Sequence, residues 1–322
     1  MTAAPVEAAD SSPDDVVIGA LRPGELPALA AVLADGLAFA PRVMEKLLAG
    51  RIASGSAPLL LVARRPGGSR SEVLGGALLD TVRPVAGGRL FTRVGVAPIW
   101  QGRGVGRALA AALCAELPPV RPPLSVEIDP ADARSSAIGA HWGLRPYQRS
   151  LRLEYDLTTP APGAGHDLRP GHDGHPAVRV SRLNDGGEPS EASWRQAFEV
   201  YATVSLDLPD RAGAPQPDYT MFRAQLPLAV GVHLAWVDGR PVGVSAAAPA
   251  QDDQWCIFLT GSVRAARRSG VARALKAAVH QTARQQGARS ISTSTLESNL
   301  AMLSLNRSLG YRVVGGISRL EI

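Results

Sequence analysis

The chain contains 322 residues, of which 45% are hydrophobic and 20% are charged, and its formal net charge is +5. This composition is typical of a soluble globular protein, and the length suggests two domains of ~150 residues. A helical membrane protein is excluded, because no apolar run approaches the ~20 residues of a membrane span. A nucleic-acid-binding protein is not favoured, because the arginines are scattered and aromatic residues make up only 5% of the chain.

The N-terminal segment and the cysteines indicate the compartment. Residues 1–15 are polar and acidic, which predicts a disordered tail rather than a secretory signal or a transit peptide. Cys114 and Cys256 are the only cysteines, and each lies in an apolar segment. We expect two reduced thiols in the core and no disulfide. The sequence therefore predicts a cytoplasmic protein.

The first half of the sequence alternates strand patterns with helical patterns. The apolar periodicity and the positions of proline and glycine predict strands at 16–21, 58–63, 73–81, 89–96, 124–128 and 147–157. Helices are expected at 26–34, at 43–49, from a glycine turn near residue 104 to about residue 117, and at 133–142. The strand at 147–157 is expected to close a first domain that spans residues 16–157.

A stretch rich in proline and glycine, 158–176, predicts a linker. It contains His166, His172 and His175 beside two aspartates, but ligands on an unsupported loop are costly to organise, so we expect no metal site. The order of elements then repeats in a second domain, 177–322. There the expected helices are 190–204, 219–225, 271–286 and 300–308, and the expected strands are 230–237, 242–249, 254–262, 290–295 and 311–322.

A glycine-rich turn joins the strand ending at Val96 to the helix that follows. It reads Gln101-Gly102-Arg103-Gly104-Val105-Gly106-Arg107. Glycine allows the backbone to curl tightly, and unpaired N–H groups at a helix N-terminus can bind a pyrophosphate. A P-loop would require Lys and Ser or Thr after the last glycine, and a Rossmann turn would require glycine at the sixth position, which is Arg107 here. Neither of these nucleotide-binding loops fits.

A second copy of this turn lies further along the chain. The motif Arg267-x-x-Gly270-x-Ala272 repeats the pattern of the first turn, again between an apolar strand and an Ala/Leu-rich helix. The separation of Gly104 from Gly270 equals, to within one position, the separation of two downstream glycines, Gly143 and Gly310. A repeat of this length, about half of the chain, indicates a duplicated domain, because solenoid units have only ~20–50 residues.

Both turns resemble the acetyl-CoA loop of the GNAT acyltransferase superfamily, whose pattern is Gln/Arg-x-x-Gly-x-Gly/Ala after a strand. The segment from Asn299 to Tyr311 is similar to the helix Asn-x-x-Met…Asn-x-x-Leu-Gly-Phe/Tyr of one GNAT subgroup. This resemblance covers nearly the whole chain and implies an α/β (α+β) protein with two tandem GNAT folds. Each would have a mixed, mostly antiparallel central sheet, flanked by helices and splayed at the acetyl-CoA site.

The resemblance also implies which residues hold acetyl-CoA. Main-chain N–H groups of the strand before each turn would bind the pantetheine arm and the thioester oxygen, and each turn would bind the pyrophosphate. The first half would use Val94, Gly95, Val96, Gln101, Gly102, Arg103, Gly104, Val105, Gly106 and Arg107. The second half would use Gly261, Ser262, Val263, Arg267, Arg268, Ser269, Gly270, Val271, Ala272, Arg273 and Asn299. Arg264 and Arg268 replace Pro98 and Gly102, so we expect a crowded second turn and firmer binding to the first.

Direct transfer of an acetyl group to an amine, in a ternary complex, is the activity that the resemblance implies. Such a transfer uses a base for the ammonium and an acid for the leaving thiolate. The candidates for the base are carboxylates at strand ends, namely Glu127, Asp129, Asp252, Asp253 and Glu297. The family's tyrosine acid is replaced by Gly139 in the first half and by Asn306 in the second. His141 lies near the first of these positions and could substitute, whereas the Asn306 amide could hold coenzyme A or the acceptor.

We therefore expect a cytoplasmic bacterial N-acetyltransferase that uses acetyl-CoA on a small-molecule amine of specialised metabolism, as a monomer or a homodimer. Two alternatives stay open: mycothiol synthase, which shares the tandem layout, and a non-catalytic acetyl-CoA-binding regulator, which the missing tyrosines favour. Protein-lysine acetylation is a weaker alternative, because nothing in the sequence marks a peptide groove. Loops near 35–50 and 205–225 are expected to set the identity of the acceptor.

Overall fold

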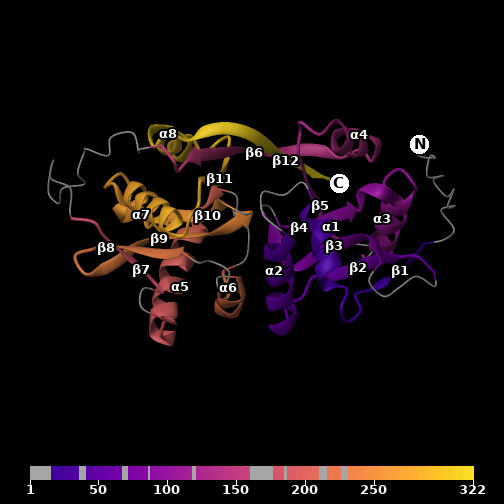
Figure 1. Cartoon of the computed structure of the whole chain (residues 1–322), viewed down its shortest axis with the longest axis horizontal. Coiled ribbons are helices and arrows are strands. Elements are labelled where there is room, and N and C mark those ends of the chain that lie inside the picture. Colours follow the sequence, from indigo (N-terminus) through magenta and orange to yellow (C-terminus); the bar gives the residue numbers. More distant parts are fainter. Residues whose placement is uncertain are drawn as a thin grey trace, which may run out of the picture.

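The computed structural model describes residues 16–35, 41–66, 72–85, 88–117, 121–159, 177–184, 187–209, 216–225, 231–251 and 253–322. Their strands form one sheet in the order β1-β2-β3-β4-β5-β12-β6-β11-β10-β9-β8-β7 (Figure 1). The pairs β4–β5 and β10–β11 are parallel, and the other neighbouring strands of the described sheet are antiparallel. The mixed, mostly antiparallel α/β architecture predicted from the sequence is confirmed.

The helices and strands of the first half follow the predicted order. They are β1 (Val17–Ala20), α1 (Leu26–Ala34), α2 (Pro41–Ala53), β2 (Leu59–Arg64), β3 (Val73–Val85), β4 (Arg89–Val96), α3 (Val105–Ala115), β5 (Leu124–Ile128), α4 (Ala133–His141) and β6 (Arg145–Asp156). A single turn of 3₁₀-helix, Pro98–Trp100, separates β4 from the glycine turn.

The second half repeats this order after the linker, whose residues 160–176 lie outside the described part of the chain. Its elements are β7 (Arg179–Arg182), α5 (Glu191–Leu206), α6 (Tyr219–Gln225), β8 (Gly231–Val237), β9 (Arg240–Gln251), β10 (Gln254–Ser262), α7 (Val271–Gln285), β11 (Ser290–Leu296), α8 (Leu300–Ser308) and β12 (Arg312–Glu321). Here too a 3₁₀ turn, Arg264–Ala266, precedes the glycine turn.

The last strand of each half lies in the sheet of the other half. β12 pairs with β5, where Arg319 lies opposite Glu127, and β6 pairs with β11, where Tyr155 lies opposite Ile291. β6 and β12 also pair with each other at the centre of the molecule (Figure 1). The expectation that residues 147–157 close the first domain is therefore wrong. This strand completes the sheet of the second half, and β12 completes the sheet of the first.

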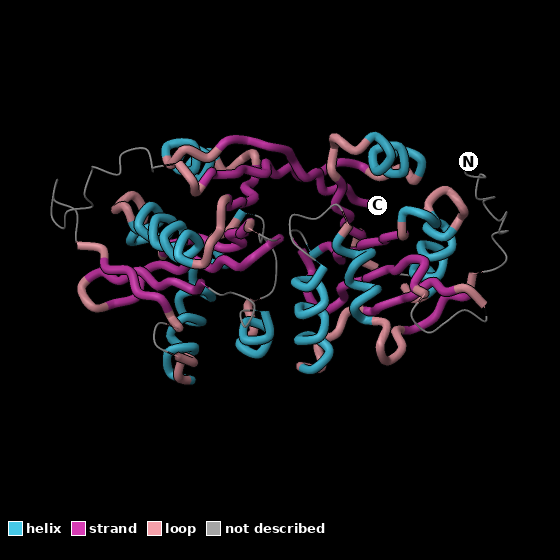
Figure 2. The backbone as a smooth tube through the Cα atoms, viewed as in Figure 1, coloured by secondary structure: helices cyan, strands magenta, loops and turns pink. Residues whose placement is uncertain are grey.

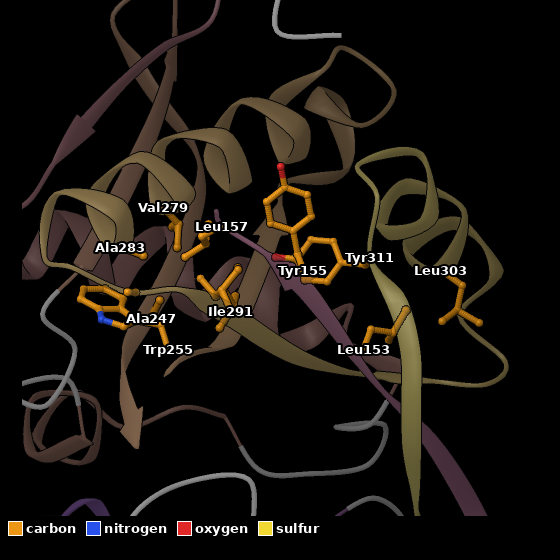
Figure 3. Close-up of a cluster of buried hydrophobic side chains, with 12 residues drawn as sticks. Leu153, Tyr155, Leu157, Ala247, Trp255, Val279, Ala283, Ile291, Leu303 and Tyr311 are labelled. Carbon is orange, nitrogen blue, oxygen red and sulfur yellow. The ribbon is translucent and has the colours of Figure 1, made fainter. Parts of the chain in front are cut away.

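The exchange places first-half side chains in a second-half core. Figure 3 shows Leu153 and Tyr155 of β6 among residues of α7, β11, α8 and the start of β12. Both are nearly inaccessible to solvent, and the Tyr155 ring lies 5.5 Å from that of Tyr311. Burying side chains of this size contributes about 1.5–3 kcal/mol each. The two halves are therefore held together by a shared core as well as by main-chain hydrogen bonds.

Helices cover both faces of the sheet in each half (Figure 2). α1 and α2 lie on one face of the first half and α3 on the other, while α5 and α7 take the equivalent places in the second half. α2 and α6 contact each other near the centre (Figure 1). Among the described residues, no helix combines the length and the apolar character that a membrane span requires.

Both cysteines are free thiols. α3 buries Val105, Leu109 and Leu113, which are spaced four residues apart and so form one stripe facing the sheet. Cys114 lies one residue beyond this stripe and is exposed, so the expectation of a core thiol is wrong for Cys114. Cys256 lies in β10 and is partly buried, and burial raises the pKa of its thiol.

Candidate functional site

The first glycine turn has the conformation that an anion site requires. Gly102 and Gly104 have φ angles of 80° and 82°, in the left-handed region that glycine adopts without steric cost. Gly104 is the N-cap of α3 and offers no capping side chain, so the N–H groups of the first helical turn are left for a ligand. The Gln101 side chain supports the turn by donating from Nε2 to the carbonyl oxygen of Val96, at 2.9 Å.

The second turn has nearly the same backbone. Gly270 caps α7 with a φ of 82°, and Arg268, in the place of Gly102, has a φ of 64°. A residue with a Cβ atom in this region costs about 1–2 kcal/mol. The expected crowding therefore strains the second turn but does not change its shape. Its residues Ser269 and Arg273 are engaged locally, by hydrogen bonds to the Ala266 carbonyl and to Ser308, both at 2.7 Å.

β4 and β5 separate to form a fork in front of the first turn. They pair from Leu90 with Leu124 to Thr92 with Val126, and β4 then continues along β3 alone. The N–H of Ala97 donates to β3. Because successive N–H groups of a strand point to opposite edges, those of Val94 and Val96 point toward the side that β5 has left. This open edge is the splay predicted for the pantetheine arm.

Gly95 allows α1 to approach the fork closely. A Cβ atom at Gly95 would lie 2.1 Å from the carbonyl oxygen of Val32 in α1, a distance that no side chain tolerates. In the second half a Cβ atom at Gly261 would lie 2.1 Å from the Val204 side chain of α5. Glycine at these two predicted positions is therefore required by helix packing on the fork.

The second fork differs from the first at the point where its strands part. The last pair joins Ile257 of β10 with Thr293 of β11. One extra residue, Phe258, then forms a β-bulge in β10, and its side chain is half-exposed. The N–H of Val263 donates to β9, so the prediction that this group is available to the pantetheine arm is wrong. The N–H of the neighbouring Ser262 points toward the opening. The open edge is thus present in both halves, with a phenylalanine at the base of the second.

Glu127 is the predicted carboxylate that lies at the first fork. It is the first residue of β5 beyond the paired segment, and its Oε1 accepts a hydrogen bond from Nε of Arg319 at 2.8 Å. Arg93 lies on the β4 arm and donates to the carbonyl of Leu33 at the end of α1, at 2.5 Å. Burial lowers the pKa of Arg93, and the negative charge of Glu127 acts in the opposite direction. One carboxylate and two guanidinium groups therefore meet on the α1 side of the fork.

The other predicted base candidates have local roles or lie away from a fork. Asp129 accepts from the N–H of Ala131 in a turn at 2.9 Å. Glu297 follows β11 and lies 4.0 Å from Arg149, with both side chains about half-exposed. Asp253 lies 3.6 Å from Arg289 before β10. Asp252 and the linker histidines are outside the described residues, and the residues that are described contain no cluster of three metal-binding side chains.

The positions that replace the family's tyrosine acid differ in the two halves. A Cβ atom at Gly139 would lie 2.9 Å from Cδ1 of Leu320, so a larger residue there would require the Leu320 side chain to move. Asn306 is fully buried and donates to Thr295 Oγ1 at 3.1 Å, while its Oδ1 lacks a partner among the described residues. His141 is exposed in the last turn of α4. Asn299 caps α8 by accepting from the N–H of Met302 at 3.2 Å.

Arginines near the two turns are held differently. Arg103 of the first turn lies over the Trp100 ring, 5.2 Å from its centre. In the second half, Arg264 and Arg267 both bind Asp207 at the end of α5, at 2.9 and 2.7 Å, and the hydrogen bond from Arg264 is the main cause that lowers the pKa of Asp207. The second turn is thus bridged by a carboxylate.

One arginine that sequence reasoning missed also reaches the first turn. Asp132 caps α4 by accepting from the N–H groups of Arg134 and Ser135, at 3.1 Å each. The Arg134 guanidinium binds the side chain of Gln101 and lies beside Gly102. Asp132, a typical N-cap residue just before the helix predicted at 133–142, was the available signal, because it predicts that Arg134 lies in the first turn of that helix.

Comparisons with known proteins agree with this geometry. Residues 194–311 match the model of the Acetyltransferase (GNAT) family. A tandem GNAT protein from the clavulanic acid biosynthesis pathway has a TM-score of 0.66 at 18% identity, with 96% of this chain and 98% of that chain covered. A GCN5-related N-acetyltransferase from Sphaerobacter thermophilus has a TM-score of 0.61 at 18% identity, covering 97% and 96%. No curated protein sequence matches the chain.

A third similar structure is a glucosamine N-acetyltransferase region in a fungal multi-domain β-N-acetylglucosaminidase. Its TM-score is 0.63 at 15% identity, with 95% of this chain and 38% of that chain covered. At these identities the likeness establishes the fold. Residues 194–311 are therefore similar to the GNAT acetyltransferase family, and nearly the whole length of the chain has the fold of tandem GNAT proteins.

Proposed function

We propose that the protein is an acetyl-CoA-dependent N-acetyltransferase of a small-molecule amine, with its catalytic centre in the first half. One juxtaposition carries this proposal. The first glycine turn, the outward N–H groups of Val94 and Val96, and the Glu127 carboxylate all lie at one fork. The equivalent of Glu127 in the second half, at the spacing of the repeat, is Ser294, which is not a base.

The residues present fit acetyl-CoA, which supplies an activated thioester. The left-handed turn and the first N–H groups of α3 suit a diphosphate, and Arg134 adds a positive charge beside Gly102. The open edge of β4 provides N–H donors for the pantetheine arm. The N–H of Val96 or Val94 would also donate to the thioester oxygen as it gains charge, which is where preorganised donors accelerate acyl transfer most.

The family model matches the second half, whereas we place the chemistry in the first. A family match and catalytic competence can lie in different halves, because the match reflects many positions and catalysis depends on a few. The second half keeps the matching α8 helix but has Phe258 at the base of its fork and an Asp207 bridge over its turn. We propose that it binds acetyl-CoA weakly or not at all and mainly supports the first half.

The acceptor class follows from the chemistry of the fork and from the names of similar proteins. A single carboxylate suits an ammonium group that must lose a proton before it attacks. Two similar structures are described as a glucosamine N-acetyltransferase region and as a tandem protein of clavulanic acid biosynthesis. The first description supports a small amine such as an amino sugar, and the second supports a place in specialised metabolism.

A non-catalytic acetyl-CoA-binding regulator is the second candidate. The observation that favours it is the loss of the tyrosine acid from both halves, at Gly139 and Asn306. A regulator would bind acetyl-CoA at the first turn and respond through α1 and α2 without transferring the acetyl group.

Release of free thiol from acetyl-CoA distinguishes these candidates. The full chain is incubated with acetyl-CoA and a panel of amino sugars, amino acids and polyamines, and the products are checked by mass for one added acetyl group. The enzyme gives amine-dependent thiol release, which Glu127→Gln lowers by about 10²–10⁴-fold. The regulator shows heat of acetyl-CoA binding in calorimetry and no thiol release with any amine. Activity with the cysteinyl-glucosaminyl-inositol precursor alone would identify mycothiol synthase.

A further inference from the structure

We infer that Arg319 of β12, at the far end of the chain, is a positioning residue for Glu127 in the first fork. This inference rests on the proposed function and extends it to a residue of the other half. It makes the first active site a composite, because the strand that carries Arg319 follows the entire second domain.

The geometry of the pair is that of a supported carboxylate. Arg319 and Glu127 lie directly opposite each other on adjacent antiparallel strands, so their side chains share one face of the sheet. Nε of Arg319 donates to Glu127 at 2.8 Å, and its Nη1 donates to Oε1 of Gln148 on β6 at 2.6 Å. Both members of the ion pair are about four-fifths buried. Because the guanidinium is held on both sides, it fixes the carboxylate at the base of the fork.

The duplication provides an internal comparison for this pair. Arg152 of β6 precedes Arg319 by the same spacing that separates Glu127 from Ser294, and Arg152 lies directly opposite Ser294 on β11. Both halves therefore place an arginine beside the fork, on the exchanged strand. The carboxylate opposite the arginine in the first half, Glu127, is replaced by Ser294 in the second half. Substituting each arginine in turn therefore distinguishes the effect of losing an arginine from the effect of losing the Arg319–Glu127 pair.

In the proposed reaction, Glu127 acts as the base and Arg319 holds it in place. An acceptor ammonium passes one proton to Glu127, and the neutral nitrogen forms a bond to the acetyl carbon. The carbon–sulfur bond breaks, and its electron pair leaves on the sulfur. For a primary amine, the nitrogen then loses a second proton and keeps one as the amide N–H. Of the two protons released, one reaches the thiolate and the other reaches solvent. Among the described residues, Arg319 on β12 holds the Glu127 carboxylate by a hydrogen bond, and Arg93 on β4 places a second positive charge near it.

The test compares Arg319→Gln with the matched variant Arg152→Gln. We expect Arg319→Gln to lower kcat/KM for the amine about 10- to 100-fold, with the KM for acetyl-CoA nearly unchanged. Arg319→Lys should restore only part of this rate, since it keeps the charge but not the planar fork of donors. Arg152→Gln should leave both readouts at the wild-type level.

A second measurement is independent of turnover. The environment of the Glu127 carboxylate is followed by carbon-13 NMR of labelled carboxylates, with Glu127→Gln identifying the resonance. A changed chemical shift of this resonance in Arg319→Gln, but not in Arg152→Gln, supports the inference even for a chain that transfers no acetyl group. An unchanged resonance and an unchanged kcat/KM in a folded Arg319→Gln variant would overturn it. Absence of thiol release from the wild-type chain would instead refute the proposed function.

Discussion

The two halves of the chain keep one backbone but support it with different chemistry. In the first half, buried ion pairs anchor the helices over the fork: Arg51 of α2 binds Asp80 of β3 at 2.5 and 2.8 Å, and Arg64 of β2 binds Glu25 before α1 at 2.5 and 2.6 Å. In the second half, α5 and α6 pack through a cluster of rings, which comprises Trp194, Phe198, Tyr201, Tyr219 and Phe222.

This difference shows which parts of a duplicated fold are constrained. The two turns share their dihedral angles and the two forks share their open edge, because those features depend on main-chain geometry. Side-chain chemistry has diverged around them. Diphosphate binding needs mainly the backbone, whereas proton transfer needs one particular side chain. A duplicated copy can therefore lose proton transfer and still keep the backbone of a diphosphate site.

The largest effect is expected from breaking a buried ion pair of the first half. Arg51→Met removes the guanidinium that forms two hydrogen bonds with the buried Asp80 carboxylate, which costs about 3–5 kcal/mol in the free energy of unfolding. Urea unfolding followed by circular dichroism measures this loss. Arg149→Met, which removes the exposed pair with Glu297, is the control and should change stability by less than about 1 kcal/mol. Equal losses of unfolding free energy in the two variants would contradict the distinction between buried and exposed ion pairs.

The next effect concerns the two glycine N-caps. Gly104 and Gly270 have the same φ of 82°, so valine strains both turns equally. We expect Gly104→Val to weaken acetyl-CoA binding about 100-fold in calorimetry and to abolish turnover. Gly270→Val should lower the free energy of unfolding about as much as Gly104→Val does, but turnover should persist. If binding survives the first change and is lost with the second, the assignment of the catalytic half is reversed.

A smaller effect is expected from Lys276 in the core of the second half. Its side chain is fully buried over the Tyr311 ring, and burial lowers the pKa of the amine to about 7. Burial likewise lowers the pKa of the nearby His280 to about 3. Between pH 7 and the ordinary value of 10.5, the unfolded chain binds the lysine proton and the folded chain does not, so stability rises with pH in this window.

Lys276→Met removes this dependence. Because it also removes a buried amine, it should raise the free energy of unfolding at pH 7 by about 1–3 kcal/mol. Denaturant midpoints at several pH values between 7 and 10.5 provide the measurement. A slope that persists unchanged in the variant would show that another group is responsible.

The smallest effect is expected at the bridge over the second turn. Asp207→Asn releases Arg264 and Arg267, whose charges then become available to an anion. We expect the affinity of the second turn for coenzyme A to rise about two- to five-fold, since exposed ion pairs contribute little. The measurement is calorimetry in the Gly104→Val background, where binding of coenzyme A to the first turn is weakened. Weaker binding after the change would mean that Asp207 shapes the second turn.

The sequence predicted most of this architecture because its signals are local. Apolar periodicity placed the helices and strands, and the glycine patterns placed both turns at a strand-to-helix junction. The exposure of Cys114 could also have been predicted, since the stripe at Val105, Leu109 and Leu113 leaves the next position on another face of α3. The expectation of a buried Cys114 was wrong because it treated every face of an apolar helix as buried.

The strand exchange could not be predicted from local patterns. β6 and β12 are strands of similar length that follow equivalent helices, and in a duplicated chain each has complementary edges in both β5 and β11. Side-chain alternation is satisfied by either arrangement, so only the packed structure decides. Arg319 was missed as a site residue for this reason. The repeat spacing that links it to Arg152 was available in the sequence, but it becomes informative only when the neighbouring strands are known.

The exchanged strand also has a consequence for how the chain is made. β5 is synthesised before the whole second domain, whereas β12, its neighbour in the sheet, is synthesised after most of that domain, and the ion pair between Arg89 and Glu321 spans 232 positions. While a ribosome translates the second domain, this edge of β5 has no permanent partner, and unpaired edges favour association between nascent chains. The first domain can therefore mature only after translation has passed Glu321. Its folding rate should be limited by elongation and by the slow closure of a very long loop.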